Sequence, residues 1–195
     1  MQESQRGEPL DLFSYILILN SVIYALAVAQ ILEGVSRLVQ YDHPVRAFVP
    51  HTIWVVNLFV FIFLVWWASW EFRGIEWTFP RYAYMLIAPT LFFLASSLLI
   101  PKGLCDDGVD LENHFFRIRR IFFGAYFFGA LAVFVDGNIL SDEAVWHSGR
   151  IGHIVIIGAA IAGYVSTSRR VHLALAVMTL LAYAGIALTR FFFPR

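Results

Sequence analysis

Six apolar stretches, most of them long enough to cross a lipid bilayer, follow one another along this 195-residue chain. A membrane-spanning helix needs about 20 consecutive, mostly apolar residues, and a soluble domain rarely carries six such runs in succession. The stretches are Phe13–Leu32, Thr52–Trp70, Tyr82–Ile100, Arg120–Val135, Ile151–Val165 and Val171–Thr189. They predict an all-α fold, a polytopic transmembrane helical bundle with six spans.

The composition favours the same fold class. Hydrophobic residues make up 59% of the chain and charged residues 14%, against about 45–50% and about 25% in soluble domains. The connections between the stretches are too short to bury a core of their own, so residues 1–195 are interpreted as a single integral membrane domain. The lipid bilayer is therefore the expected surrounding, and the formal net charge of zero gives no electrostatic basis for binding nucleic acid.

The distribution of basic residues indicates an orientation. The third connection and the start of the fourth span carry Lys102, Arg117, Arg119 and Arg120, whereas the segment Asp136–Glu143 is acidic and has no Lys or Arg. Basic residues near span ends favour the cytoplasmic side. The sequence thus predicts a multi-pass protein of the cell (inner) membrane with both termini outside.

Prolines and arginines suggest how individual spans are built. Pro50 suits the first turn of the second span, and Pro89 is expected to kink the third span and free a carbonyl group. The fourth and fifth spans are short, and we expect four arginines to extend them by reaching toward the lipid head groups. These are Arg117, Arg119, Arg120 and Arg150.

Small residues four positions apart occur in the fourth and fifth spans. The pairs are Ala125 and Gly129, Ala159 and Gly163, and Gly158 and Ala162. Such pairs let helix backbones approach closely in lipid, where packing drives association. They predict tight packing between these two spans.

Polar residues at the end of the first span form a candidate site. On a helix, Gln30, Glu33 and Arg37 fall within about 60° of one another, and Glu33 and Arg37 are spaced to form an ion pair. In one interpretation this pair anchors the inner end of the span. In the other it borders a cavity or binds a lipid head group.

Other polar residues are predicted to lie at the same depth. Our hypothesis is that they converge with Glu33 into one polar cluster on the cytoplasmic side, together with Ser96 and Ser97 of the third span. The candidate binding residues are Gln30, Glu33, Arg37, His51, Asn57, Arg117, Arg120 and His172.

The sequence favours a non-enzymatic role, because it contains no HExxH or GxSxG motif and no pair of histidines four apart. We expect an accessory or scaffold protein, or a small transport or binding protein, and predict no cofactor. The basic residues Arg117, Arg119 and Arg120 suit anionic lipid head groups. A membrane-protein partner and a homo-oligomer both stay open.

The alternative is an intramembrane metal- or haem-binding enzyme. His51 and His172 are predicted to lie at matching depths, and imidazole is a usual axial ligand of haem. A metal would need several histidines and carboxylates converging on it. The candidates on the outer side are Asp136, Asp142, Glu143, His147 and His153. On one helix His147 and His153 would point about 120° apart, so no metal ligand and no catalytic residue is assigned.

The acidic loop Gly103–Asn113 has a simpler explanation than calcium binding. It lacks the regular spacing of oxygen ligands in an EF-hand. Asp110 or Asn113 is expected to cap the following helix, since a side-chain oxygen there can accept from free backbone amides.

Overall fold

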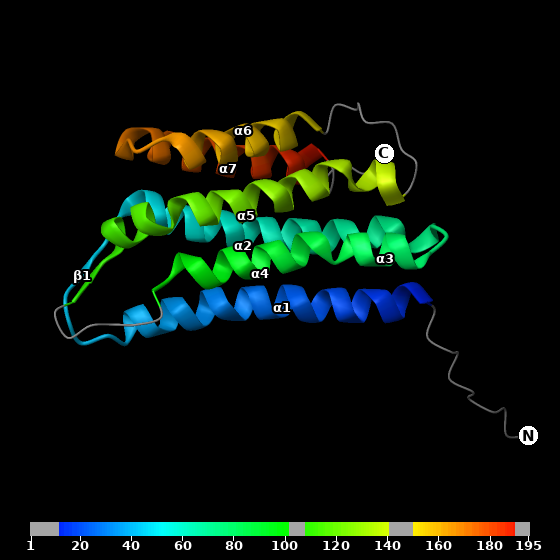
Figure 1. Ribbon diagram of the computed structural model, residues 1–195, viewed down its shortest axis with the longest axis horizontal. Coiled ribbons are helices and arrows are strands. Elements are labelled where there is room, and N and C mark those ends of the chain that lie inside the picture. The colour runs from blue at the N-terminus through cyan, green and yellow to red at the C-terminus, as the bar shows by residue number, and fades with distance from the viewer. Residues whose placement is uncertain (1–11, 102–107, 141–149, 190–195) are drawn as a thin grey trace, which may run out of the picture.

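The computed structural model describes residues 12–101, 108–140 and 150–189, and nearly all of them are helical (Figure 1). The helices are α1 Leu12–Val39, α2 Val49–Ala68, the 3-10 helix η1 Ser69–Gly74, α3 Phe79–Met85, α4 Ile87–Leu99, α5 Leu111–Leu140, α6 Ile151–Val165 and α7 Arg169–Ala187. Two short strands, β1 Val45–Arg46 and β2 Val109–Asp110, pair in parallel, with Val45 opposite Val109.

The predicted all-α bundle is confirmed. Five helical segments of the described chain are long and apolar enough to cross a membrane, and α2 with η1, like α3 with α4, counts as one such segment. The remaining helix, α6, has 15 residues, or a length of about 22 Å against a hydrocarbon layer of about 30 Å. The length and apolar composition of the five longer segments are those of a membrane protein. The sixth crossing, by α6, stays a prediction.

The helices lie side by side, and successive spans along the chain run in opposite directions (Figure 1). Neighbours in space follow the order α1, α4, α5, α6, α7, α2, and contacts between α2 and α1 close the ring. Helix α2 also contacts α4 and α5 across the ring. Helices α1 and α6 lie at opposite edges of the bundle in Figure 1.

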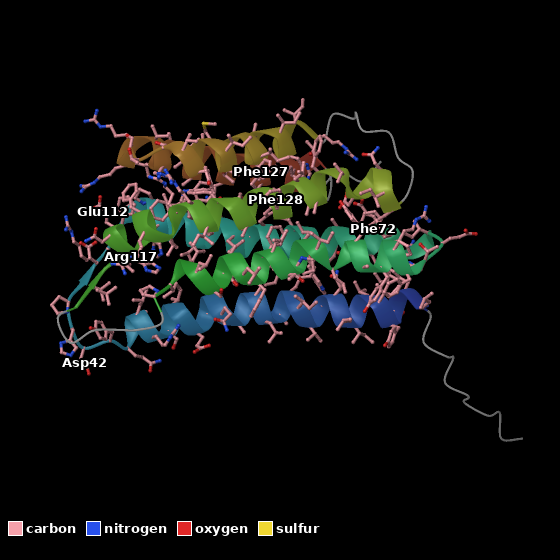
Figure 2. The ribbon with its side chains drawn as sticks, viewed as in Figure 1. Asp42, Phe72, Glu112, Arg117, Phe127 and Phe128 are labelled. Atoms are coloured by element: carbon pink, nitrogen blue, oxygen red, sulfur yellow. The ribbon has the colours of Figure 1, made fainter. Side chains whose placement is uncertain are left out.

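The bundle has two distinct ends, which we name after their small elements. The β end holds β1, β2 and the start of α5, and the η end holds η1 and the end of α5. Figure 2 shows Asp42, Glu112 and Arg117 at the β end and Phe72 toward the η end. Under the predicted orientation, the β end is the cytoplasmic one.

Aromatic rings fill the space between α2 and α5. Trp54 is fully buried, and its ring meets Phe123 edge-on with centroids 4.8 Å apart. Further along α2, the ring of Phe61 stacks on Tyr183 of α7 at 5.1 Å. Such rings bury large apolar areas in defined geometries, so they fix how α2, α5 and α7 pack.

Glycines in the bundle provide space for these rings. A methyl group built on Gly163 of α6 would lie 2.5 Å from the ring of Phe123 in α5, and one on Gly129 of α5 would lie 2.5 Å from Phe92 in α4. The predicted packing of the fourth and fifth spans is confirmed, because α5 and α6 are neighbours. Gly129, however, serves the contact with α4.

The third span is interrupted where Pro89 predicts a kink. Helix α3 ends at Met85 and α4 begins at Ile87, because Pro89 has no amide hydrogen for the carbonyl of the residue four positions earlier. The hydroxyl of Thr90 donates to the Leu86 carbonyl at 2.8 Å. Just before the break, the Tyr84 hydroxyl donates to the carbonyl of Ala132 in α5 at 2.5 Å.

The fourth span differs from its prediction. Helix α5 begins at Leu111, well before Arg120. Its first turns are polar, so they lie outside the apolar run from which the span was predicted. Arg117 and Arg120 are exposed. The prediction that Arg119 and Arg150 reach toward head groups is wrong, since both are buried, with exposed fractions of 7% and 5%.

Candidate functional site

Two histidines at the β end cap the same helix terminus. His51 of α2 donates through Nε2 to the carbonyl of Leu99 at 2.6 Å, and His114 of α5 donates to the carbonyl of Leu98 at 2.9 Å. Helix α4 ends at Leu99, so these carbonyls have no amide partner within the helix. Because a carbonyl can only accept, each ring must carry its hydrogen on Nε2.

His172 and Asn57 make equivalent contacts between other helices. His172 is fully buried and donates through Nε2 to the carbonyl of Ser166, the residue after α6, at 3.0 Å. Asn57 of α2 is also fully buried and donates to the carbonyl of Ala176 in α7 at 2.9 Å. These polar side chains therefore join helices through backbone carbonyls.

The predicted cluster is only partly assembled. His51 and His172 both contact the ring of Phe115, with centroid distances of 6.2 and 4.9 Å. The expectation that Glu33 joins these histidines is wrong. Its side chain is 63% exposed and pairs with Arg37 at 3.9 Å. The inward face of α1 passes through Ile31 and Gly34, which are buried, and Glu33 lies on the outer face.

The remaining predicted residues lie apart from this group. Gln30 is half-buried on α1, and Arg117 and Arg120 are exposed on α5. The hydroxyls of Ser96 and Ser97 donate to carbonyls of their own helix, those of Phe93 and Leu94. Side-chain bonding of this kind within a helix satisfies the hydroxyl without a partner from another span.

The space between His51 and His172 is already filled. Phe115, which is fully buried, contacts both imidazoles, so a haem bound between them would have to displace this ring. In residues 12–101, 108–140 and 150–189, no three His, Cys, Asp or Glu side chains are grouped to hold a metal ion. The predicted metal candidates Asp142, Glu143 and His147 lie outside these residues.

Ion pairs join three connections at the β end. Arg46 of β1 donates to Asp110 of β2 at 3.1 Å and lies 3.9 Å from Glu112, which also contacts Arg169 of α7. The expected helix cap is present too, because Asp110 accepts from the amides of Glu112 and Asn113. These amide bonds, with Arg46 adding to them, hold the pKa of Asp110 below its usual value.

Two small cavities lie at the η end, each of about 30 Å³. Cavity A lies among α2, η1, α5, α6 and α7, and its polar residues are Glu71, Asp136, His153 and Tyr183. Cavity B lies among α1, α2, η1, α3, α4 and α5, and its polar residues are Tyr24, Ser69, Tyr84 and Asp136. Asp136 of α5 therefore borders both cavities.

Arginine and tyrosine side chains surround the end of α5 near these cavities. The buried Arg150 donates to the carbonyl of Phe134 and to the side chain of Asn138 at 3.2 Å. Tyr183, at the far side of cavity A, shares a hydrogen bond with the hydroxyl of Tyr126 in the core. The η end thus combines buried polar groups with internal space.

The sequence pattern indicates Asp136 and His153 as candidate metal ligands on the outer side. It missed Glu71, Tyr24 and Tyr84, which come from other helices. The available signal was an acidic residue inside an apolar run, since ionisable groups within spans are costly and tend to mark functional sites. Which helices would meet at Asp136 requires the three-dimensional order of the bundle.

No protein-family model, curated protein or solved structure matches this chain.

Proposed function

We propose that this protein is a non-enzymatic accessory or scaffold protein that packs against a helix of another membrane protein. The observation that carries the proposal is the outward face of α6. Its residues Ile151, Ile154, Ile161 and Val165 have exposed fractions of 64, 43, 53 and 69%. Gly158, in the middle of this face, has no neighbour within 4 Å of a built methyl group. We call these five residues the α6 stripe.

The spacing of the α6 stripe suits a partner helix. Its members lie three, four, three and four residues apart, which keeps them on one face of a helix. Helix α6 packs mainly on α5 and α7 and lies at an edge of the bundle (Figure 1). In lipid, exposed apolar side chains give no hydrophobic drive toward association, but a glycine notch allows a backbone to approach closely.

The inner-membrane location and external termini are part of this proposal. Arg117, Arg120 and Arg170 are exposed at the β end. Basic side chains at the cytoplasmic surface are attracted to anionic lipid head groups by about 1 kcal/mol each. Contact with such head groups would hold the β end on the cytoplasmic side.

A transport role at the β end has less support. It requires Asn57 and Gln30 to border a wet passage, whereas Asn57 is fully buried and bonded to the Ala176 carbonyl. Its neighbours His51 and His172 are likewise packed around Phe115. These contacts favour the scaffold interpretation over transport at this end, and Phe115 disfavours the haem alternative.

The proposal is tested by replacing Gly158 with leucine. The native protein is purified in mild detergent from its own membranes, and the mass and composition of the complex are measured. We expect a stoichiometric membrane-protein companion that Gly158→Leu removes, because leucine fills the notch. The matched control is Gly185→Leu on the exposed face of α7, where a built methyl group also meets nothing within 4 Å.

Two outcomes would contradict the proposal. One is equal retention of the companion by both variants, which would exclude the α6 stripe as its binding surface. The other is a homodimer without any companion, disrupted only by Gly158→Leu, which would show that α6 contacts a second copy.

A further inference from the structure

We infer that Asp136 and His153 form a hydrated proton-binding site at the η end, with Asp136 and His153 sharing one proton through water in cavity A. This inference does not depend on the α6 stripe or on a partner. It concerns a binding site, and the bound species is a proton taken from water at the membrane surface.

The cavities are large enough to hold water. A water molecule needs about 10–15 Å³ of such space and two or more polar partners. Each cavity has about 30 Å³, and cavity A offers the polar groups of Glu71, Asp136, His153 and Tyr183. Both cavities are therefore suited to one or two water molecules beside Asp136.

The two titrating groups come from different helices and meet at one space. Asp136 is half-buried on α5, and His153 lies in the first turn of α6 with an exposed fraction of 8%. A carboxylate and an imidazole that border the same water can exchange a proton without direct contact. Imidazole is the side chain whose charge changes near neutral pH. A proton shared between the carboxylate and the imidazole is therefore expected to respond to changes in physiological pH.

Cavity A also has a route to the surface. Glu71 borders cavity A and is exposed on η1, so it connects the internal water with the outside. On the inner side the hydrogen-bonded hydroxyls of Tyr183 and Tyr126 continue into the core. Protons therefore enter from the η end, and binding one raises the net charge of the site by one.

Several elements contribute charged or ionisable groups around Asp136. Among the described residues at the cavities and beside the end of α5, these are Tyr24 of α1, Glu71 of η1, Tyr84 of α3, Asp136 itself on α5, Arg150 just before α6, His153 of α6 and Tyr183 of α7. Tyr84 donates its hydrogen to the Ala132 carbonyl, and Arg150 donates to the Phe134 carbonyl. The ionisable side chains that border cavity A besides Tyr183 are thus Asp136 of α5, His153 of α6 and Glu71 of η1.

The test is infrared difference spectroscopy of the full-length protein in lipid nanodiscs during a pH titration. The method follows the carbonyl stretch of protonated carboxyl groups. Because the chain has 14 Asp and Glu residues, the signal of Asp136 is the component of the carboxyl band that is lost in Asp136→Asn. We expect His153→Gln to raise its midpoint by about one pH unit, because a nearby imidazolium favours the ionised carboxylate.

The matched control is Asp42→Asn, which removes an exposed carboxylate at the β end and should leave the component assigned to Asp136 unchanged. A carboxyl band in Asp136→Asn that is identical to that of the unaltered protein would overturn the assignment to Asp136. An unchanged midpoint in His153→Gln would overturn the shared proton, and this second comparison decides the question even where Asp136→Asn does not fold.

Discussion

Single residues in this bundle are constrained by the rings they face. Phe123 is fully buried, and it lies against Gly163, Trp54 and the ring of His172. The ring cannot move aside without disturbing all three neighbours. A side chain added at Gly163 must therefore displace packed groups, whereas one added at Gly158, on the same helix, meets open space.

We expect Gly163→Ala to destabilise the protein by about 1–3 kcal/mol, the usual effect of overpacking a filled core. The matched control, Gly158→Ala, should cost nothing, because alanine is the better helix former and its methyl group is unobstructed. Reversible unfolding in mixed detergent micelles measures both changes. Equal stability of the two variants would contradict the packing of α6 on Phe123.

For single residues, the sequence predicts the depth in the membrane better than the side of the helix on which a residue lies. His51, Asn57 and His172 were expected in one polar region, and His51 and His172 do share Phe115. Glu33 was expected with them but faces outward. The apolar pattern of α1 is too uniform to show which face is buried, so the direction of Glu33 depends on how α1 packs on α4.

Among the apolar helical segments of the described chain, α6 is the shortest, because α3 and α4 together form one longer segment. It has 15 residues, and its first turn is tied to α5 by Arg150, whose guanidinium contacts the Phe134 carbonyl and lies 5.1 Å from the Phe134 ring centre. This contact and the packing of Gly163 on Phe123 together hold α6 against α5.

Replacing Arg150 with methionine should destabilise the protein by about 2 kcal/mol, because hydrogen bonds to charged groups contribute about 1.5–3 kcal/mol. Hydrogen exchange of α6 amides should accelerate more than that of α2 amides. The control is Arg170→Met, whose side chain is exposed at the start of α7. A variant at Arg150 as stable as this control would exclude the proposed role of the contact.

The apolar runs of the sequence predict the bounds of some helices but not of others. The fifth span was predicted as Ile151–Val165, as found for α6. The fourth was predicted to start at Arg120, but α5 starts at Leu111 after the Asp110 cap. Hydropathy locates the lipid-facing part of a helix, while capping residues locate its start.

For the molecule as a whole, the open question in the topology is whether α6 crosses the membrane. We expect a reporter that works only in the cytoplasm to be active when fused at His43 and at Thr167, and inactive at Gly74. His43 and Thr167 follow α1 and α6, and Gly74 ends η1. Reporter activity at His43 combined with silence at Thr167 would contradict six crossings.

The order of the helices in space could not be read from the sequence. Short connections predict neighbours along the chain, yet α1 packs mainly on α4, and α2 packs mainly on α7. These pairings arise from the match between rings and small residues, such as Phe92 with Gly129. For this reason Asp136 and Glu71 meet at cavity A although they are far apart in sequence.

The ion pairs at the β end have a mechanical consequence. Arg46, Asp110, Glu112 and Arg169 link three separate connections, and the paired strands add backbone bonds between two of them. Helices that are linked at one end of a bundle keep their spacing there, so their spacing changes most easily toward the other end. A change in the tilt of α6 therefore pivots beside Arg46, and at the η end it is opposed by the bond from Arg150 to the Phe134 carbonyl of α5.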